Sequence, residues 1–477
     1  MVNQRASAPR VYAVDGVPPE ILAYALARYS RSRKSLIEHL EAVSQAQAAQ
    51  FFNTFYYAYG HASIADLAHV ALAIEEISLL AAMEVVAEPL WDGQERSTRY
   101  QDFGRDGWWQ PEEADPAYDG AIERLLGAYR QAAETAWQEL ATRHPKPPSL
   151  SVAEWERTLR ARAFDRSRGF LPLAMKTALG QITSARSLER QVARLMASPF
   201  PEVRQVASAI REAATARPAW RLDGQGHAAP TGQPAVPTLL RHAEPTPYLA
   251  AVDARLTELV AEEFPGVDPP DPPVALYLPQ DWELHHLAVA IYRHAQRSYG
   301  TIVEKLATWP RERLARWYAV LWEARGPHDA WPTWMQSGPL VFDLVVDVGA
   351  FRDFNRHRRL AKAVQPLHEA LGWSPEAFGD PPSSVGQKVL AQHYQNLPAH
   401  PEPVRPYLLP LAHRRRLLLS MDLAEAAYLI ELRTRPQGHP SYRRTAWRMF
   451  EALSARLPTV AAHIRAVPPE VEDPFTR

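Results

Sequence analysis

Hydrophobic and polar residues recur along much of this chain with the spacing of amphipathic helices. A helix is predicted to open at residues 17–20, where two prolines and a glutamate precede regularly spaced apolar positions. Residues 45–59 are rich in aromatic side chains, which predicts a buried helix that ends at Gly60. A further helix is predicted to start at Ser63 as N-cap, and a long helix is expected from about residue 118 to about residue 144.

Two apolar segments, residues 67–91 and 342–351, each lead to a cluster of charged residues. The first contains a histidine and several glutamates, so it is not predicted to span a membrane. A short strand is predicted at residues 274–278, and the arginine run at residues 414–416 is expected to lead into an apolar helix. Long helices with few strands predict a helix-rich α+β fold.

The two halves of the chain resemble each other. Residues 25–30 are similar to residues 288–293, and the two apolar segments precede charged clusters in parallel positions. Residues 214–239 are rich in Pro, Gly and Ala without apolar periodicity, which predicts a linker. We interpret the chain as an internal duplication, with a first copy at residues 1–213 and a second, diverged copy at residues 240–477.

Composition excludes several classes of chemistry. The chain has 477 residues, a formal net charge of −1 and no cysteine. A charge near zero argues against a protein that coats nucleic acid, and the lack of cysteine excludes disulfides, thiolate zinc sites and a cysteine nucleophile. The first ten residues are not followed by an apolar signal-peptide region, so a cytoplasmic protein without a membrane segment is predicted.

The most informative charged cluster is residues 92–100, which follow the first apolar segment. Asp92 and Gly93 predict a turn, so the cluster is expected at the end of an element. The fork of Arg99 can bind a phosphate or a carboxylate, and the hydroxyl of Ser97 can complete an anion site. A charged surface turn, in which the arginines pair with Glu95 and neighbouring acids, is the alternative.

Residues 95–100, Glu-Arg-Ser-Thr-Arg-Tyr, resemble the Glu-x-Ser-x-Arg-Tyr end of the flavin-dependent thymidylate synthase signature. His61 and Ser63 match the family's His-x-Ser/Thr motif, whereas residues 87–89 lack its Arg-His-Arg triplet, which stands at residues 356–358. Residues 167–188 contain near matches to the Ala-Arg-x-x-Leu-Pro and Asn-Ala-Arg-Ser-Leu patterns. The chain resembles the long, two-copy members of this family over most of its length.

The resemblance implies a role for each residue that matches a family motif. Arg433, in the family's second Leu-Arg motif, would be catalytic and stabilise negative charge on the pyrimidine ring. The implied substrate-binding residues are Glu95, Ser97, Arg99, Tyr100 and Arg168. The implied cofactor-binding residues are Ser30, His61, Ser63, Arg186, Arg356, His357 and Arg358. No metal site is expected.

The activity implied by the resemblance is the reductive methylation of dUMP to dTMP. FAD is the implied cofactor, and methylenetetrahydrofolate and NADPH are the implied co-substrates. A homodimer that forms a pseudo-tetramer is expected, because each copy keeps a different half of the signature. Whether pockets form within or between chains is open at this stage. Departures at Glu84, Gln94 and Ser184 favour one alternative, a non-catalytic relative that retains a flavin or nucleotide pocket. A flavoenzyme for another pyrimidine nucleotide is a further alternative.

Overall fold

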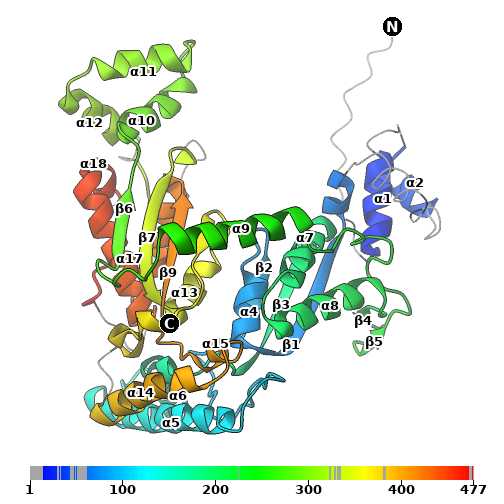
Figure 1. The fold of residues 1–477 in the computed structure, drawn as a ribbon. Helices are drawn as coiled ribbons and strands as arrows, with labels where there is room; N and C mark the ends of the chain where they lie inside the picture. The colour runs from blue at the N-terminus through cyan, green and yellow to red at the C-terminus, as the bar shows by residue number, and fades with distance from the viewer. Residues whose placement is uncertain are drawn as a thin grey trace. The chain divides into compact units, whose positions relative to one another are not determined.

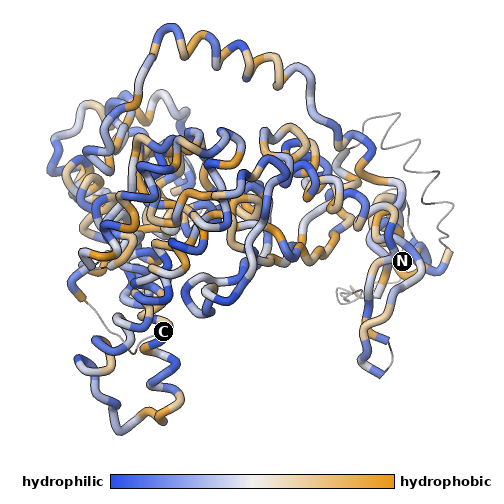
Figure 2. Tube along the Cα trace, turned by 60° about the horizontal axis from the view of Figure 1, so that its bottom comes forward, coloured by the Kyte–Doolittle hydropathy of each residue, from blue (hydrophilic) through white to orange (hydrophobic). Residues whose placement is uncertain are grey.

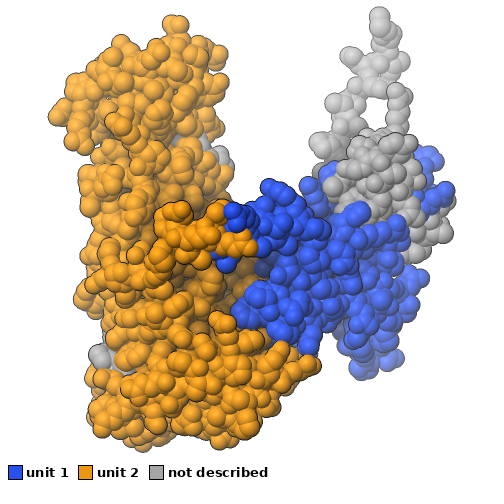
Figure 3. All heavy atoms as spheres, in the orientation of Figure 1, with its two compact units in different colours: residues 1–75, 90–94, 179–257 blue, residues 76–89, 95–178, 258–477 orange. Residues whose placement is uncertain are grey.

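The computed structural model describes residues 14, 16–29, 32, 34–42, 48, 50, 62–223, 225–321, 324–326, 329, 335–379, 383–471 and 475. The chain divides into two compact units (Figure 3). Unit 1 comprises residues 1–75, 90–94 and 179–257, and unit 2 comprises residues 76–89, 95–178 and 258–477. Unit 2 thus contains segments of both sequence copies, and the division into copies at residues 213–240 stays a prediction about the sequence.

Unit 1 holds short helices and a hairpin (Figure 1). Its elements are α1 (Pro19–Tyr29), α2 (Leu36–Glu41), the 3-10 helix η2 (Ala62–Leu67), α7 (Ala185–Met196), α8 (Pro201–Thr215), β4 (Trp220–Leu222) and β5 (Ala228–Pro230). Four elements run from one unit into the other: β1 (His69–Ser78), β2 (Asp92–Glu95), β3 (Lys176–Ser184) and α9 (Pro247–Glu263). The strands β1, β3 and β2 form a sheet in this order.

Unit 2 combines a four-stranded antiparallel sheet with many helices. The strands are β6 (Val274–Tyr277), β7 (Leu340–Asp347), β8 (Ala361–Val364) and β9 (Arg414–Met421), in the order β6-β7-β9-β8. The helices are α4 (Leu79–Val86), α5 (Tyr118–Arg143), α6 (Val152–Ser167), α10 (Trp282–Tyr292), α11 (Tyr299–Ala307), α12 (Arg311–Val320), α13 (Val348–Asn355), α14 (Ser384–Asn396), α15 (Arg405–Leu408), α16 (Leu423–Arg433), α17 (Pro440–Arg456) and α18 (Pro458–Ala461). The 3-10 helices are η3 (Arg168–Phe170), η5 (Glu369–Leu371), η6 (Pro375–Phe378) and η7 (Leu397–Ala399).

The core of unit 2 lies where α17 packs against β6 and β7 (Figure 1). Phe342 and Leu344 of β7 are fully buried, because β7 is paired on both sides and covered by this helix. The helix contributes Met449 and Leu453 to the same core. Hydrophobic and hydrophilic residues alternate along the helical turns (Figure 2), as expected for helices with one buried face.

The fold class expected from the sequence, a helix-rich α+β fold with a tandem duplication, is confirmed. The order β1-α4-β2 recurs as β7-α13-β8, and β3 leads into α7 as β9 leads into α16. The sheet orders β1-β3-β2 and β7-β9-β8 match as well. The helix that follows β1 and the helix that follows β7 each start at a capping side chain, Ser78 for α4 and Asp347 for α13.

A repeated sequence joins the two copies inside unit 2. Residues 171–174, Leu-Pro-Leu-Ala, recur as residues 409–412. The two stretches bond to each other reciprocally: the Leu173 N–H donates to the Leu409 carbonyl at 2.9 Å, and the Leu411 N–H donates to the Leu171 carbonyl at 2.8 Å. This reciprocity is what an approximate twofold relation between the copies produces.

Several predicted elements appear where expected, among them α1, α5 and β6. The helix predicted at residues 45–59 and its end at Gly60 lie outside the continuously described residues. The helix predicted from Ser63 is wrong: η2 is a short 3-10 helix, after which the chain enters β1. The predicted linker at residues 214–239 contains the hairpin of β4 and β5.

Three further predictions about local structure are wrong. Asp92 and Gly93 begin β2 rather than a turn, and Gly93 is needed because a Cβ there would lie 2.3 Å from the Gly180 carbonyl oxygen. The arginine run at residues 414–416 lies in β9, so the expected apolar helix, α16, begins only at Leu423. The triplet at residues 356–358 follows α13 and does not form a helical turn. Among the described residues, no helix is both long and apolar enough to cross a membrane.

Candidate active site

Five arginines, called here the arginine cluster, gather in unit 2. They are Arg99, Arg168, Arg352, Arg356 and Arg433. The first four line a cavity of about 30 Å³ together with residues 95–98, Gly349 and Asp353. This is the room of roughly one water molecule, so a larger anion can enter only if the side chains rearrange.

The fold brings these side chains together from distant parts of the sequence. β2 ends at Glu95 and delivers residues 95–99 to the cavity. Arg352 and Arg356 are four residues apart, so they leave α13 and its C-cap on the same side. Arg168 is the first residue of η3, directly after α6.

Arg352 forms a buried ion pair with Glu95, from its Nη2 to the Oε1 of the carboxylate. Its Nη1 also approaches the Thr98 hydroxyl at 3.4 Å. A buried pair of this kind holds the loop after β2 against α13, because separating the two charges would leave each one unpaired. The sequence-based alternative, in which Glu95 pairs with a neighbouring arginine of its own loop, does not describe this contact.

Arg99 binds Asp165 of α6 with both arms of its fork. The Nε donates to Oδ1 at 2.6 Å and the Nη2 donates to Oδ2 at 2.9 Å. The same Nη2 also donates to the Gln437 carbonyl at 2.8 Å. Burial opposes ionisation of both groups, but their mutual attraction prevails, so the pKa of Arg99 lies above and that of Asp165 below its ordinary value.

Asp353 is the carboxylate at the centre of the cluster. It accepts from the Nη2 of Arg356, and from the Nη1 of Arg433 at 3.3 Å, while its carbonyl accepts from the Nη2 of Arg433 at 2.8 Å. Burial alone would raise the pKa of this carboxyl. The surrounding guanidinium groups, Arg356 first, outweigh burial and hold the pKa of Asp353 far below its usual range.

Arg168 differs from the other arginines because its Nη2 is buried with no hydrogen-bond partner among the described residues. Its side chain is 3% exposed. Burial lowers the pKa of Arg168 and outweighs the opposing effect of Asp353 and Asp165. Gly349 makes room for it, because a Cβ at that position would lie 3.3 Å from the same Nη2. A buried cation with an unused donor is a strong binding group for an anion.

The predicted site residues of unit 2 fall into three groups. The cavity brings together Glu95, Ser97, Arg99, Arg168 and Arg356. Arg433 and His357 lie beside it: Arg433 contacts Asp353, and the buried His357 contacts Arg433. Tyr100 is 52% exposed with its ring 5.6 Å from the Arg99 guanidinium, and Arg358 is exposed.

The remaining predicted cofactor residues are not part of this cavity. Ser63 is exposed on η2, and Arg186 forms a 2.9 Å ion pair with Asp66. Both residues belong to unit 1. Ser30 and His61 lie outside the described residues.

Sequence reasoning missed several members of the site, chiefly Asp165, Gly349, Arg352 and Asp353. Their signal was present in part. Arg352 and Asp353 precede the Arg-His-Arg triplet by one helical turn, which places them beside Arg356. No comparable signal marks Asp165, whose partner Arg99 is 66 residues away.

The corresponding positions of the other copy have lost the charges of the site. Ala87 and Arg356 are equivalent, since each is the C-cap residue of an eight-residue helix that directly follows a strand. By the same spacing Met83 stands for Arg352, and Val364 of β8 stands for Glu95 of β2. At these three positions apolar side chains stand where the arginine cluster has charged ones.

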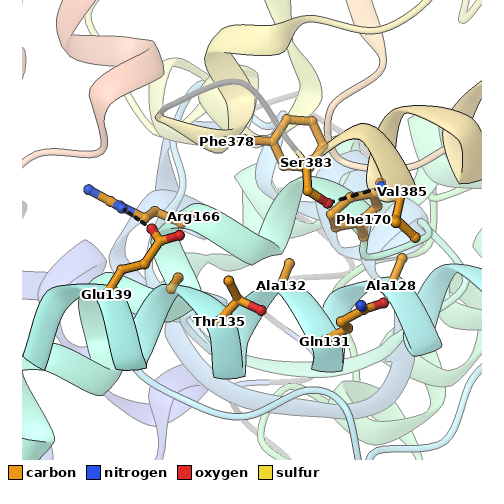
Figure 4. Close-up of a pocket in the computed structure, with 12 residues that line it drawn as sticks. Ala128, Gln131, Ala132, Thr135, Glu139, Arg166, Phe170, Phe378, Ser383 and Val385 are labelled. Atoms are coloured by element: carbon orange, nitrogen blue, oxygen red, sulfur yellow. Dashed lines mark hydrogen bonds and ion pairs between the residues drawn. The ribbon is translucent and has the colours of Figure 1, made fainter. Parts of the chain in front are cut away.

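A second cavity of about 330 Å³ lies between α5 and α14 (Figure 4). Side chains of α5 form one wall, and Phe170 and Phe378 lie opposite with ring centroids 4.7 Å apart. Arg166 and Glu139 form a 3.5 Å ion pair at one end. None of the predicted site residues lines this cavity.

Among the described residues, no group of three or more histidine, aspartate or glutamate side chains could hold a metal ion.

Comparison with known proteins places these observations in a family. A sequence model of the family described as thymidylate synthase complementing protein matches residues 14–218 and 338–459. The chain is 25% identical over 442 residues to the UPF0159 protein of Chlamydia muridarum, covering 88% of this chain and 81% of that protein. It is 24% identical over 495 residues to the UPF0159 protein Ta1429 of Thermoplasma acidophilum, covering 93% and 94%.

Among solved structures, the chain is similar to the UMP/dUMP methylase PolB from Streptomyces cacaoi bound with 5-Br dUMP. The identity is 14% and the TM-score 0.29, with 41% of this chain and 97% of that chain covered.

Proposed function

Because the chain belongs to the thymidylate synthase complementing protein family, we propose that it catalyses the reductive methylation of dUMP to dTMP. FAD is the proposed cofactor, and methylenetetrahydrofolate and NADPH are the proposed co-substrates. The observation that carries this proposal is Arg168, a buried guanidinium with an unused donor at a cavity lined by further arginines. Such a site is suited to the phosphate of a nucleotide.

Different residues around the cavity are assigned to the phosphate and to the pyrimidine of the substrate. We assign the phosphate to Arg99, Arg168 and the Ser97 hydroxyl, with Tyr100 at the exposed rim. Glu95 holds Arg352 and so keeps the loop in place. Arg433 would face the pyrimidine, where a guanidinium stabilises the negative charge that develops on the ring. The proposed reaction requires no nucleophilic side chain of the enzyme.

The residues present are compatible with a flavin diphosphate near the triplet. The Nε of Arg356 is buried without a hydrogen-bond partner among the described residues, and Arg358 is exposed. Arg356 and Arg358 would hold the cofactor phosphates, and the bound flavin would supply the hydride. Ser63 and Arg186 stay predicted cofactor residues, as do Ser30 and His61.

The arginine cluster combines both sequence copies within one chain. Arg99 belongs to the first copy and Arg356 to the second, yet both line the same cavity of unit 2. This favours pockets that form within a chain. The homodimer with pseudo-tetrameric symmetry stays a prediction, and it would hold two such sites.

The alternatives are a non-catalytic nucleotide-binding relative and a flavoenzyme for another pyrimidine nucleotide. One observation favours them: Ser184, which stands where the family has an asparagine, caps α7 and accepts from the Ser187 N–H at 3.2 Å. Its hydroxyl is thus used for the helix rather than kept for a ligand.

The phosphate assignment is tested by changing Arg168 to methionine. We expect dUMP binding to weaken by roughly 1.5–3 kcal/mol, because a charge-assisted hydrogen bond is lost. The fold should persist, since the change removes a buried charge that has no direct partner. Calorimetric titration with dUMP, and with deoxyuridine, which lacks the phosphate, measures the effect. Arg157→Met, an exposed arginine on α6, is the matched control. Equal dUMP affinity in both variants would reject the assignment.

The cofactor assignment is tested by changing Arg356 to alanine. The purified parent is expected to be yellow and to release FAD, whereas the variant should retain a clearly smaller amount per chain. The reason is the loss of a guanidinium with an unused buried donor. Arg359→Ala, which removes an exposed ion pair with Asp422, is the control and should leave the flavin content unchanged. If folded Arg356→Ala retains the parental amount of FAD per chain, Arg356 does not bind the cofactor.

A further inference from the structure

His357 is held by hydrogen bonds at both ring nitrogens. Its Nδ1 lies 2.7 Å from the Oε1 of Glu425, and the Nε of Arg433 donates to its Nε2 at 3.0 Å. Because a guanidinium Nε–H can only donate, Nε2 must be the acceptor. The proton of the neutral ring is then on Nδ1, where it is donated to the carboxylate. The contacts therefore select one tautomer.

The surroundings of the ring favour the neutral form. His357 is 5% exposed. Burial lowers its pKa, Glu425 opposes this, and Arg433 adds to the lowering, so the net pKa lies below the ordinary value. The other groups that face it are Asp353 from α13 and the ring of Tyr428 from α16, with centroids 5.9 Å apart.

The same contacts fix the orientation of Arg433. Its Nε is bound to His357, and its Nη1 and Nη2 are bound to the carboxylate and the carbonyl of Asp353. The guanidinium also lies over the ring of Tyr442, with 5.5 Å between its carbon and the ring centroid. Of the five N–H donors of an arginine, two then stay available, one on each Nη.

We propose that His357 is a positioning residue that aims Arg433 at the pyrimidine through a neutral imidazole, and that it is not a ligand of the cofactor. The chain of contacts runs from Glu425 through His357 to Arg433, with each donor matched to an acceptor. This inference rests on the proposed function, because it assigns a purpose to the orientation of Arg433.

Protonation of His357 would break this arrangement. A proton on Nε2 would replace the acceptor by a donor and place a second cation against Arg433. The affinity for dUMP should therefore be constant near neutral pH and fall as the pH drops below the ordinary histidine value of about 6.5. Asp353 and Glu425 would attract both cations but cannot restore the lost hydrogen bond.

Two substitutions of His357 distinguish the contact made by its Nε2 from the contact made by its Nδ1. The amide of glutamine in His357→Gln reaches the place of Nε2 and can offer an oxygen to Arg433. The shorter amide in His357→Asn reaches the place of Nδ1 and can serve only Glu425. We expect dUMP affinity within about threefold of the parent for His357→Gln and a loss of about tenfold or more for His357→Asn. FAD content should be parental in both, and the loss of affinity between pH 7 and 6 should be smaller in His357→Gln than in the parent.

The outcomes distinguish this inference from the proposed function. A parent that binds FAD but no dUMP overturns the proposed function and the inference with it. A parent that binds dUMP, with equal losses in both variants or with a loss of FAD in both, overturns the inference alone. If neither variant folds, ¹⁵N NMR of the parent decides: a neutral ring protonated on Nδ1 supports the inference, and a ring protonated on Nε2 overturns it.

Discussion

Replacing Asp353 by asparagine is expected to destabilise the protein by about 3–5 kcal/mol, the usual result of removing one partner from a buried ion pair. Asp353 is buried and touches Arg356 and Arg433, and the charges of Arg168 and Arg99 also act on it. Without the carboxylate, these arginines would repel one another in a region from which water is largely excluded. Urea unfolding of parent and variant measures the difference.

A dianion should rescue this variant. If the cavity binds phosphate, then added inorganic phosphate or dUMP replaces the missing negative charge and raises the melting temperature of Asp353→Asn more than that of the parent. Asp343→Asn is the matched control, because its 3.2 Å ion pair with Arg416 is more exposed and should be worth about 1 kcal/mol or less. A variant as stable as this control would show that Asp353 does not neutralise the cluster.

The sequence was most informative where chemistry follows from a short motif. Residues 95–99, Arg168 and Arg356 come from three separate motifs and line one cavity. The duplication was also readable, because the copies lost complementary halves of the signature. The ion pairs inside the site could not be predicted from the sequence. Arg99 and Asp165 are 66 residues apart, and Arg352 and Glu95 are 257 residues apart, so only the fold pairs them.

Local structure was predicted well where it depends on local signals. The prolines at the start of α1 and the length of α5 sufficed. The prediction failed where tertiary packing decides. Gly93 looks like a turn glycine but lies in β2, because a neighbouring strand approaches too closely for a side chain. The arginine run at residues 414–416 looks like the start of a helix, but β9 pairs with β7 along its whole length.

The protein is expected to lose its fold in mild acid, because four histidines are buried in the neutral form. Burial is the main cause in each case, and it lowers the pKa of His286 and His393 to about 4 and that of His413 and His439 to about 3. Two of these rings bond uncharged groups: the Nε2 of His393 donates to the Leu408 carbonyl, and Nδ1 of His413 bonds the Tyr394 hydroxyl. Charging either ring would therefore place a buried cation against an uncharged partner.

The sign of the effect follows from proton binding. In the unfolded chain each histidine takes up a proton at about pH 6.5, whereas the folded chain does so only at about 4 or below. The unfolded state therefore binds more protons between these values, and stability falls as the pH falls. At pH 5 the loss is about 2 kcal/mol per histidine, or about 8 kcal/mol for four, against a typical total of 5–15 kcal/mol.

Buried carboxyls offset part of this loss. Burial raises the pKa of Glu20, Glu283 and Asp347, so these groups take up protons more readily in the folded chain. Asp353, like the histidines, makes the folded state less stable as the pH falls. It does so only at lower pH, because its pKa lies far below the usual range. The histidines thus determine the slope between about pH 6.5 and 5, where carboxyls of ordinary pKa are already ionised.

Urea unfolding at a series of pH values tests this expectation through the number of protons taken up on unfolding. We expect several protons between pH 6 and 5, and about one fewer in His393→Gln, whose amide can still donate to the Leu408 carbonyl but cannot titrate. His227→Gln is the control: the ring is largely exposed, so its removal should leave the slope unchanged. If the parent takes up almost no protons on unfolding in this pH range, the four rings gain protons in the folded state as readily as in the unfolded chain, and the expectation is wrong.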